Sequence, residues 1–396
     1  MKVYIEKSRA GGTVKAPPAK SYAHRMLICS SLADSPGTIR GVYESEDVLA
    51  SIDCCRALCA DVRLSGDTAY VTPSGGSGGD LYCRESGSTL RFFIPVCLFL
   101  GEERVFRGSE RLMERPLGVY RDICREKGLI FEKNKDSLRV GGRLTDIDML
   151  IDGSVSSQFV TGLMLAAPLS GRVQRIRLSL PVVSRPYIEI TRTVMERYGV
   201  KTEWEDESTI RIDGGPYRGT DAVVEGDWSN AAFLFALGLF GDVTVTGLDP
   251  DSVQGDRVCV KQLASLREGY AVIDITDCPD NGPVLMAAAA ALHGARLKGT
   301  SRLRAKESDR GEAMAAELRK FGAEVTVFDD EIEIKSGIRR PDTALYGHND
   351  HRVVMALSVL LTLTGGEIDG AEAVNKSYPG FFGDLERLGI GVGYEI

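Results

Sequence analysis

Apolar residues recur at helical spacing in six stretches of the chain, and a short strand-like run follows each of them. The spacing i, i+3, i+4 places these residues on one face of a helix. The copies are VLASIDCCRALCADVRL, LGVYRDICREKGLIFE, YIEITRTVMERYGVKTEW, CVKQLASLREGYAVIDI, AMAAELRKFGAEVTV and FFGDLERLGIGVGYEI. A small residue separates helix from strand in each, namely Ala60, Gly128, Gly199, Gly269, Gly322 and Gly389. We expect these residues to adopt the left-handed conformation that ends a helix before a strand.

The six copies indicate internal duplication, because they recur through most of the chain at comparable intervals. Successive small residues are 53 to 71 positions apart. Six α/β units in 396 residues divide into two domains of three units each. A new unit starts near the middle of the chain, at Gly226-Asp227.

A second type of helix, apolar on nearly all sides, is predicted in each unit. The copies are AHRMLICSSLA, STLRFFIPVCLFL, SQFVTGLMLAAPL, SNAAFLFALGLF, PVLMAAAAALHG and HRVVMALSVLLTL. This composition is typical of buried helices, so the amphipathic helices should lie outside, beside the sheets. The longest apolar stretch, Val353–Leu363, is shorter than the ~18 residues that indicate a membrane span.

Basic residues stand at the starts of many of these helices. The positions are Lys20-Ser21, Arg115-Pro116, Arg185-Pro186, Lys306–Arg310, His351-Arg352 and Lys376-Ser377. A cation there faces the positive end of the helix dipole, which is unfavourable unless an anion binds between them. The repetition therefore predicts a ligand with several phosphate or carboxylate groups. We expect Pro116 and Pro186 at first helical positions and Ser21 as an N-cap.

Polar residues near two other helix starts are candidates for the same ligand. Ser156, Ser157 and Gln158 open an apolar helix, and Ser184 and Tyr187 flank Arg185-Pro186. Hydroxyl and amide groups can bind phosphate or ligand hydroxyls. An ordinary serine N-cap explains the first group equally well on spacing alone.

Three carboxylates lie among these cations and are candidates for proton transfer. Glu307 stands between Lys306 and Arg310, Asp280 precedes a buried helix, and Asp350 lies beside Arg352. Neighbouring cations lower the pKa of a carboxyl group, so proton transfer would depend on burial and bound substrate. On sequence alone, Glu307 is more often a salt-bridge partner than a catalyst.

Composition and charge narrow the class of partner. Hydrophobic residues make up 43% and charged residues 26%, as in a globular enzyme. The net charge of −8 argues against non-specific binding to nucleic acid or membranes, so an anion must be held by a local basic pocket. Nine cysteines without a CxxC pair indicate buried reduced thiols. The N-terminus lacks the apolar core of a signal peptide, so we expect a cytoplasmic protein.

Two further motifs do not carry a function. His348, Asp350 and His351 suggest a metal site, but HExxH is absent and only His24 and His293 remain elsewhere, so we expect no metal. The glycine-rich run Ser74–Asp80 fits neither GxGxxG nor GxxxxGKS, and we interpret it as a flexible loop.

Several of these segments occur together, in a fixed order, in one known family. They are PPAKSYAHR (17–25), ESGSTLR (85–91), RP (115–116), SSQF (156–159), SRPYIEIT (184–191), GDWS (226–229), QGD (254–256), PDN (279–281), RAKESDR (304–310), DHR (350–352) and KSYPGFF (376–382). From Gly12 to about Phe382 the chain resembles the 5-enolpyruvylshikimate-3-phosphate synthases, which are enolpyruvyl transferases. Each motif alone is weak evidence for this family, whereas the complete set in this order is specific for it.

The resemblance implies an α/β (α+β) fold of two similar domains. Each would contain three βαβαββ units with buried helices, in an inside-out α/β barrel arrangement, and two chain crossings would form a hinge. Residues 17–225 would form one domain, and 1–16 with 226–396 the other, with the active site in the cleft between them. The implied reaction transfers the enolpyruvyl group of phosphoenolpyruvate to the 5-hydroxyl of shikimate 3-phosphate, through a tetrahedral ketal that loses phosphate. The resemblance implies no cofactor, and we expect a monomer.

Site residues follow from the resemblance, motif by motif. Phosphoenolpyruvate would be bound by Lys20, Gly87, Arg115, Gln158, Arg310, Arg352 and Lys376. Shikimate 3-phosphate would be bound by Lys20, Ser21, Arg25, Ser156, Ser157, Gln158, Ser184, Tyr187, Asp280 and Lys306. Proton transfer would involve Lys20, Asp280, Glu307 and Lys376.

The chain departs from the common family pattern at Ala19, at Glu85-Ser86 and at Arg302. The second departure adjoins the expected phosphoenolpyruvate site and leaves glyphosate sensitivity open. Three alternatives remain. The first is a UDP-N-acetylglucosamine enolpyruvyl transferase, which usually has a Lys-Asn pair where this chain has Lys20-Ser21. The second is an RNA 3′-phosphate cyclase, for which a basic surface is expected. The third is a non-catalytic binding paralogue, which need not retain the acidic residues.

Overall fold

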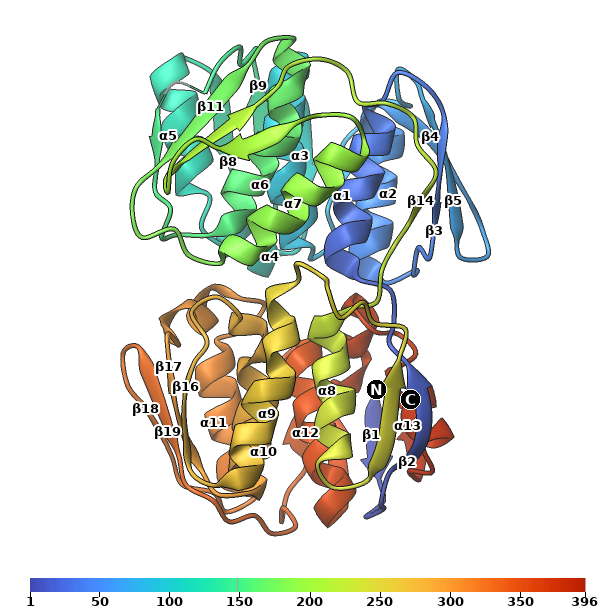
Figure 1. Ribbon diagram of the computed structural model, residues 1–396, viewed down its shortest axis with the longest axis vertical. Helices are drawn as coiled ribbons and strands as arrows, with labels where there is room; N and C mark the ends of the chain where they lie inside the picture. Colours follow the sequence, from blue (N-terminus) through green and yellow to red (C-terminus); the bar gives the residue numbers. More distant parts are fainter. Residues whose placement is uncertain (148, 396) are drawn as a thin grey trace. The chain divides into compact units, whose positions relative to one another are not determined.

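The computed structural model describes residues 1–147 and 149–395. The chain folds as two compact units (Figure 1). Unit 1 consists of Met1–Pro17 and Gly226–Ile396, and unit 2 of Pro18–Glu225. The chain therefore passes from unit 1 to unit 2 after Pro17, and returns after Glu225.

Unit 2 contains three four-stranded sheets with one strand order. The first sheet runs β14 (Ala222–Val223), β3 (Gly37–Arg40), β5 (Thr68–Pro73), β4 (Ala60–Ser65). The second runs β6 (Leu81–Tyr82), β7 (Arg104–Arg107), β9 (Ser137–Gly141), β8 (Ile130–Lys133). The third runs β10 (Leu150–Ile151), β11 (Gln174–Leu178), β13 (Thr209–Ile212), β12 (Thr202–Trp204). In each sheet the first pair is parallel and the rest are antiparallel, which is the βαβαββ pattern.

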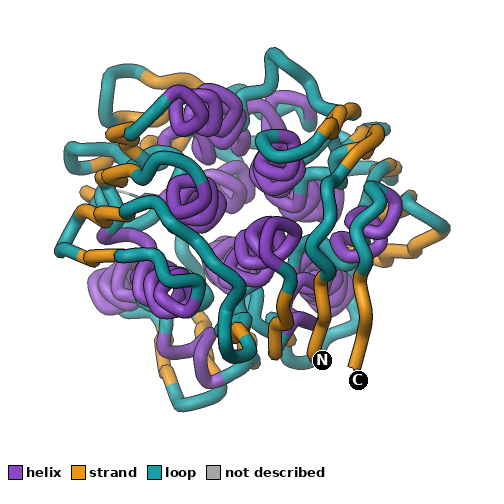
Figure 2. Tube along the Cα trace, turned by 90° about the horizontal axis from the view of Figure 1, so that it is seen from below, coloured by secondary structure: helices purple, strands orange, loops and turns teal. Residues whose placement is uncertain are grey.

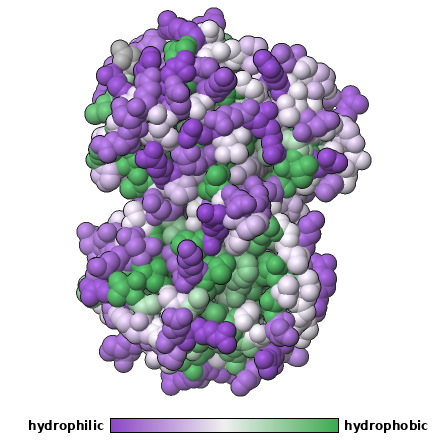
Figure 3. All heavy atoms as spheres, viewed as in Figure 1, coloured by the Kyte–Doolittle hydropathy of each residue, from purple (hydrophilic) through white to green (hydrophobic). Residues whose placement is uncertain are grey.

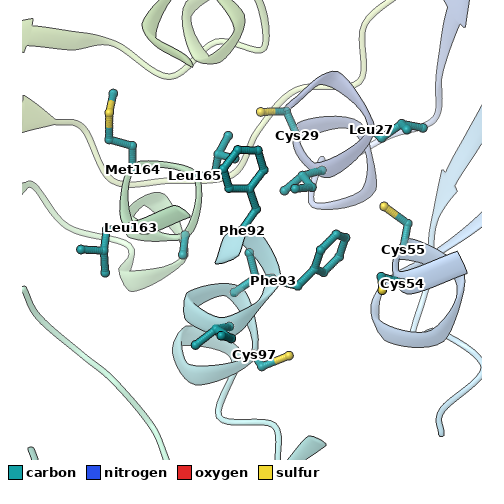
Figure 4. Packing of buried hydrophobic residues seen from close by; sticks show 14 of the residues in the cluster. Leu27, Cys29, Cys54, Cys55, Phe92, Phe93, Cys97, Leu163, Met164 and Leu165 are labelled. Atoms are coloured by element: carbon teal, nitrogen blue, oxygen red, sulfur yellow. The ribbon is translucent and has the colours of Figure 1, made fainter. Parts of the chain in front are cut away.

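The helices of unit 2 supply its core. They are α1 (Lys20–Ser31), α2 (Glu46–Leu58), α3 (Gly87–Leu100), α4 (Glu110–Glu114), α5 (Gly118–Lys127), α6 (Ser157–Ala166) and α7 (Arg185–Arg197), with a 3-10 turn η1 (Ala167–Ser170). In α3 every residue except Ser88 and Leu100 is buried. Figure 4 shows apolar side chains of α1, α2, α3 and α6 gathered in one core. The prediction of buried, apolar helices is confirmed.

Unit 1 repeats the same sheet twice. One sheet runs β16 (Ala271–Asp274), β17 (Ala295–Lys298), β19 (Glu331–Ile334), β18 (Val325–Val327). The other runs β20 (Leu345–Tyr346), β21 (Gly366–Asp369), β1 (Lys2–Ile5), β22 (Val392–Glu395). Here the N-terminal strand β1 takes the place that the last strand of the repeat holds elsewhere, and it pairs antiparallel with both β21 and β22.

The third sheet of unit 1 is smaller. It pairs β2 (Gly11–Lys15) with β15 (Asp242–Thr246) in parallel, and within the described residues it has two strands. The fourth copy of the repeat in chain order is thus reduced, since the hairpin that follows the amphipathic helix in the first three copies is missing from this sheet.

The helices of unit 1 are α8 (Trp228–Gly238), α9 (Cys259–Glu268), α10 (Gly282–Ala291), α11 (Arg310–Lys320), α12 (His351–Thr364) and α13 (Phe381–Arg387). Its 3-10 turns are η2 (Gly255–Val258), η3 (Pro279–Asn281), η4 (Ser301–Ala305) and η5 (Ala371–Lys376). Strands lie mostly toward the outside and helices toward the middle (Figure 2). Hydrophobic residues gather on the visible face of unit 1 over α8 and α9 (Figure 3).

The expected helix ends are confirmed at four of the six small residues. Gly128, Gly199, Gly322 and Gly389 have φ of 65°, 84°, 90° and 82°, in the left-handed region. The prediction is wrong for Ala60, which is the first residue of β4, because Cys59 already ends α2. It is also wrong for Gly269, whose φ of 164° is extended.

Three predicted helix starts are displaced. Proline disfavours helical backbone in the residue before it, so Arg115 is extended and ends α4, and α5 begins only at Gly118. Pro186 is the second residue of α7 rather than the first. Ala19 is the N-cap of α1, and Ser21 lies within the first turn. The helix starts at Arg310 and His351 are as expected.

The nine cysteines are buried and free, as expected. A search of the described helices finds none that is long and apolar enough to cross a membrane. Within the same residues, no three His, Cys, Asp or Glu side chains gather as a metal-binding group.

Candidate active site

Asp280 is the centre of a charged cluster in unit 1. Its Oδ1 lies 3.0 Å from Nζ of Lys306 and 2.8 Å from Nη1 of Arg310, and its Oδ2 lies 3.1 Å from Nη2 of Arg352. The 3-10 turn η3 holds Asp280 just before α10, while the three cations come from the starts of α11 and α12 and from the segment before α11. Cations from separate repeats thus converge on one carboxylate.

Arg310 extends this cluster to two further carboxylates. Its Nη2 lies 2.5 Å from Oε2 of Glu307, and its Nε lies 2.8 Å from Oδ2 of Asp350. The Arg310 side chain is 1% exposed, and Asp350 is fully buried. Asp350 also caps α12, because its Oδ1 accepts a hydrogen bond from the backbone N–H of Arg352. One guanidinium therefore fixes three carboxylates that lie just before the starts of α10, α11 and α12.

The electrostatics of the cluster keep Asp280 ionised. Burial alone would raise the pKa of Asp280, but the charges of Arg352, Lys306 and Arg310 hold it well below its usual range. Burial lowers the pKa of the Lys306 ammonium, and Asp280 opposes that shift. Burial would also lower the pKa of Arg310, but Asp350, Glu307 and Asp280 raise it above the ordinary arginine value. The cluster thus presents an ionised carboxylate within a nearly balanced set of charges.

Lys376 is tied to the same region through a tight turn. Its Nζ donates a 2.6 Å hydrogen bond to the backbone carbonyl of Asn349, the residue before Asp350. His348 and Asn349 have φ of 50° and 51°, which is unusual for residues with a side chain. A 2.9 Å contact between Nε2 of His348 and Oε1 of Glu317 holds this turn.

Lys20 and Asp47 form a second charged group, in unit 2. Nζ of Lys20 lies 2.7 Å from Oδ2 of Asp47, and the side chains are 17% and 11% exposed. Lys20 begins α1, and Asp47 is in the first turn of α2. A carboxylate in a first turn is favoured by the helix dipole, so Asp47 offsets the charge that Lys20 places at its own helix start.

Arg25 is held in the interior of unit 2 by hydroxyl and carbonyl oxygens. It donates to Oγ1 of Thr191 (2.8 Å), the carbonyl of Ser21 (2.6 Å), Oγ1 of Thr161 (3.2 Å) and the carbonyl of Tyr187 (3.1 Å). Burial lowers the pKa of Arg25 to about 10, so it remains a cation at neutral pH. These contacts use most of its five N–H groups and bring Ser21, Arg25 and Tyr187 together.

Gly87 and Arg115 fit closely at the start of α3. A Cβ on Gly87 would lie 2.7 Å from Cζ of Arg115, so a side chain there would displace the guanidinium. Gln158 is oriented nearby, since its Oε1 accepts from Arg91 (2.6 Å) and its Nε2 donates to Oγ of Ser88 (3.1 Å).

The serines occupy two helix starts. Ser156 is the N-cap of α6, and its Oγ accepts from the backbone N–H of Gln158 at 3.3 Å, so the ordinary capping role is confirmed. Its hydroxyl proton is still able to donate. Ser157 follows as the first residue of α6. Ser184 precedes α7 with φ of 52° while 1% exposed, a strained backbone of the kind that clusters at functional sites.

Sequence reasoning missed several residues that orient the expected site. Asp47 faces Lys20, Arg91 orients Gln158, and Thr161 and Thr191 hold Arg25. The sequence did contain a signal for Arg91, because a charged residue within an apolar helix needs polar partners when it is buried. The sequence contained no such signal for Asp47, because acidic residues are common in the first turn of a helix.

Known proteins match this chain along nearly its whole length. The model of the family described as EPSP synthase (3-phosphoshikimate 1-carboxyvinyltransferase) matches residues 5–385. The chain is 36% identical to a 3-phosphoshikimate 1-carboxyvinyltransferase of Clostridium kluyveri, with 98% of this chain and 97% of that protein covered. It is 34% identical to one of Brachyspira hyodysenteriae, with coverage of 99% and 100%.

Solved structures share the fold. An EPSP synthase of Acinetobacter baumannii superposes with a TM-score of 0.78 at 21% identity, covering 99% of this chain and all of that one. The enolpyruvyl transferase NikO of Streptomyces tendae gives a TM-score of 0.74 at 15% identity, with 99% and 98% covered. At these identities the structures support the fold, while the full-length family match and the curated relatives identify the family. The chain belongs to the EPSP synthase family.

Proposed function

We propose that this protein transfers the enolpyruvyl group of phosphoenolpyruvate to the 5-hydroxyl of shikimate 3-phosphate and releases phosphate. The reaction would serve the shikimate pathway of aromatic amino-acid biosynthesis. The family supports this reaction. The single structural observation that carries it is the ionised Asp280 held by Lys306, Arg310 and Arg352.

The cations of both units would bind phosphoenolpyruvate. Arg310, Arg352 and Lys376 in unit 1, and Lys20 and Arg115 in unit 2, offer N–H donors to its carboxylate and phosphate. Arginine suits these groups because its planar fork donates two parallel hydrogen bonds. Gly87 would allow close approach, and Gln158, fixed by Arg91 and Ser88, would lie beside both substrates.

Shikimate 3-phosphate would be bound mainly by groups of unit 2. Hydroxyls of Ser21, Ser156, Ser157, Ser184 and Tyr187, together with Lys20, Arg25 and Gln158, would receive its phosphate and hydroxyl groups. The location of Ser156 and Ser157 at the start of α6 favours a phosphate there, because free N–H groups and the helix dipole point to it. Asp280 and Lys306 of unit 1 would contact the ring hydroxyls.

Asp280 is ionised and can therefore accept a proton, but its low pKa makes it a weak base until bound anionic substrates offset the surrounding cations. In the addition step, the 5-oxygen forms a bond to C2 of phosphoenolpyruvate and its proton passes to Asp280. C3 gains a proton from Glu307 to become a methyl group, which requires that Glu307 be protonated beforehand, as the negative charge of the bound substrates would favour. In the elimination step, Glu307 takes a proton back from that methyl group, the C2–O bond to phosphate breaks, and Asp280 returns its proton to the leaving phosphate. Lys20 and Lys376 would stabilise the charges that develop.

The proposal is tested by phosphate release from phosphoenolpyruvate, with shikimate 3-phosphate or UDP-N-acetylglucosamine as the acceptor. Release only with shikimate 3-phosphate, with the enolpyruvyl ether detected by mass spectrometry, is the expected result. Release only with the sugar nucleotide would keep the chemistry and change the acceptor. Folded protein that is silent with both would be a binding paralogue.

The proposal also includes a monomer that works in the cytoplasm without a cofactor. A monomer is supported by the fact that a single chain supplies all the residues assigned to the two substrates. Sedimentation during turnover tests it, and activity confined to a larger species would contradict it. Turnover that survives dialysis against a chelator is the result expected for the cofactor-free reaction.

A further inference from the structure

A continuous chain of buried hydrogen bonds joins three helices of unit 2. Nδ1 of His24 in α1 lies 2.7 Å from Oγ of Ser51 in α2, and that oxygen lies 2.8 Å from Oγ1 of Thr89 in α3. Oγ1 of Thr89 lies 2.8 Å from Oγ of Ser86, the residue that caps α3. Each of these four side chains is at most 1% exposed.

The donors and acceptors of this chain run in one direction. Thr89 donates its hydroxyl proton to Ser86, so Ser51 must donate to Thr89 and His24 must donate from Nδ1 to Ser51. This order requires a proton on Nδ1 of His24. Within the described residues Nε2 has no hydrogen-bond partner, which suits an unprotonated nitrogen better than an N–H.

The network lies close to the helix starts that carry the expected phosphoenolpyruvate groups. His24 follows Lys20 by four residues in α1, and Ser51 follows Asp47 by four residues in α2. Residues four apart share one helix face, so both network residues lie one turn below the ion pair of Lys20 and Asp47. In α3, Thr89 stands two residues after Gly87, and its hydroxyl lies 3.5 Å from the carbonyl of Asp47.

The same three helices also pack through an apolar core. Figure 4 shows Cys29 of α1, Cys55 of α2 and Phe93 of α3 in one group of buried side chains. Apolar contacts of this kind are non-directional, so they hold the helices together without fixing their relative register. A satisfied buried polar network does fix register, because any slip leaves a desolvated donor or acceptor unpaired.

We propose that the network of His24, Ser51, Thr89 and Ser86 positions the start of α3 relative to Lys20 and Asp47, and so sets the affinity for phosphoenolpyruvate. The inference rests on the proposed function. These residues are positioning residues, since none is expected to touch substrate. Loss of the Thr89 hydroxyl would release the start of α3, and with it Gly87, Ser88 and the Arg115 guanidinium that packs on Gly87.

The test compares Thr89→Val with Thr89→Ser. Valine keeps the shape and removes the hydroxyl, whereas serine keeps the hydroxyl. We expect Thr89→Val to raise KM for phosphoenolpyruvate by about tenfold or more, since small displacements of binding groups have large effects. KM for shikimate 3-phosphate should change less than about twofold, because its expected ligands lie mainly on α1, α6 and α7. Thr89→Ser should restore the wild-type value.

Thr362→Val is the matched control. Thr362 is a buried threonine near the end of α12, and its hydroxyl donates to the carbonyl of Val359 within its own helix. This variant should lose stability in urea without changing either KM. Ser51→Ala provides a second, smaller break in the network and should shift KM in the same direction as Thr89→Val. In the double variant, the loss of binding free energy for phosphoenolpyruvate should be smaller than the sum of the losses in the two single variants, because both substitutions disrupt the same network.

Several results would overturn the inference. If Thr89→Val lowered only the urea midpoint, or raised both KM values equally, the network would be structural alone. If Thr89→Ser failed to restore KM, the hydroxyl would not be the cause. Phosphoenolpyruvate binding is also measured by calorimetry with shikimate 3-phosphate present, so the variants remain informative without turnover. Absence of turnover in the wild type would contradict only the proposed function.

Discussion

Asp280 and Arg310 form a 2.8 Å ion pair in which the arginine side chain is almost fully buried. The same guanidinium also contacts Glu307 and Asp350. A lysine could not replace it, because an ammonium group on a flexible stem cannot present a planar fork to three carboxylates. The proton-transfer candidates Asp280 and Glu307 are therefore held by one shared partner.

Arg310→Ala should destabilise unit 1 strongly. It removes the partner of three carboxylates, and breaking a buried ion pair from one side costs about 3–5 kcal/mol. Arg304→Ala is the control, because Arg304 pairs with the exposed Asp329 and such pairs contribute about 1 kcal/mol or less. Urea unfolding of both variants measures the difference. Equal midpoints would show that the cluster contributes little to folding.

Glu307→Gln should keep substrate binding and lower kcat by about two to four orders of magnitude. Glutamine preserves the shape and can still accept a hydrogen bond from Arg310, but it cannot exchange a proton with C3. Glu312→Gln, at an exposed position in the first turn of α11, should leave kcat unchanged. Steady-state kinetics with both substrates make the comparison. Unchanged turnover in Glu307→Gln would remove Glu307 from proton transfer.

Arg115→Ala should weaken phosphoenolpyruvate binding by about 2–5 kcal/mol, the usual loss for a charged contact. The affinity for shikimate 3-phosphate should change little. Arg121→Ala removes an exposed arginine from α5 and serves as the control. Calorimetric titration of each variant with phosphoenolpyruvate measures the affinity. An unchanged affinity in Arg115→Ala would exclude Arg115 from the phosphoenolpyruvate site.

Stability should fall as the pH drops below about 6.5, the ordinary histidine pKa, in a way that depends on His24. Burial, with the charges of Lys20 and Arg25, holds the pKa of His24 well below its usual range. The unfolded chain therefore binds a proton that the folded chain does not, which lowers the free energy of unfolding by about 1.4 kcal/mol per pH unit in this range.

His24→Asn isolates this effect. The asparagine amide can donate to Ser51 as Nδ1 does, but it does not titrate, and the other histidines are common to both proteins. The difference between the urea stabilities of wild type and variant should shrink from pH 7 to pH 5. Parallel stability curves would mean that the pKa of His24 is the same in the folded and the unfolded chain.

Local patterns predicted the helices of this fold better than their ends. The apolar runs of α3 and α10 identify buried helices, because a helix without a polar face has no other stable location. The N-cap expected at Ser21 is wrong by two residues, because Lys20 is already helical and Ala19 takes that position. The helix expected to begin at Pro116 begins only at Gly118, and the extended Arg115 ends a separate short helix, α4.

The network of His24 and Thr89 could not be predicted, since it depends on contacts between residues 27 and 38 positions apart in the sequence. Each residue alone looks like an ordinary member of an apolar helix. Motif order drew attention to Lys306, Arg310 and Arg352, and the structure shows that these three cations meet at Asp280. The domain division follows from long-range strand pairing, which local periodicity does not contain.

Strand β1 has a consequence for the order in which the protein is completed during synthesis. β1 emerges from the ribosome before residues 18–225, yet its two neighbours, β21 and β22, emerge after them. Residues 18–225 can fold as they appear, while the first residues wait for the final ones. A nascent chain stopped before Val392 would carry a finished unit 2 and an open sheet edge in unit 1, which is a template for aggregation. Emergence of β22 is thus the step that completes the sheet around β1.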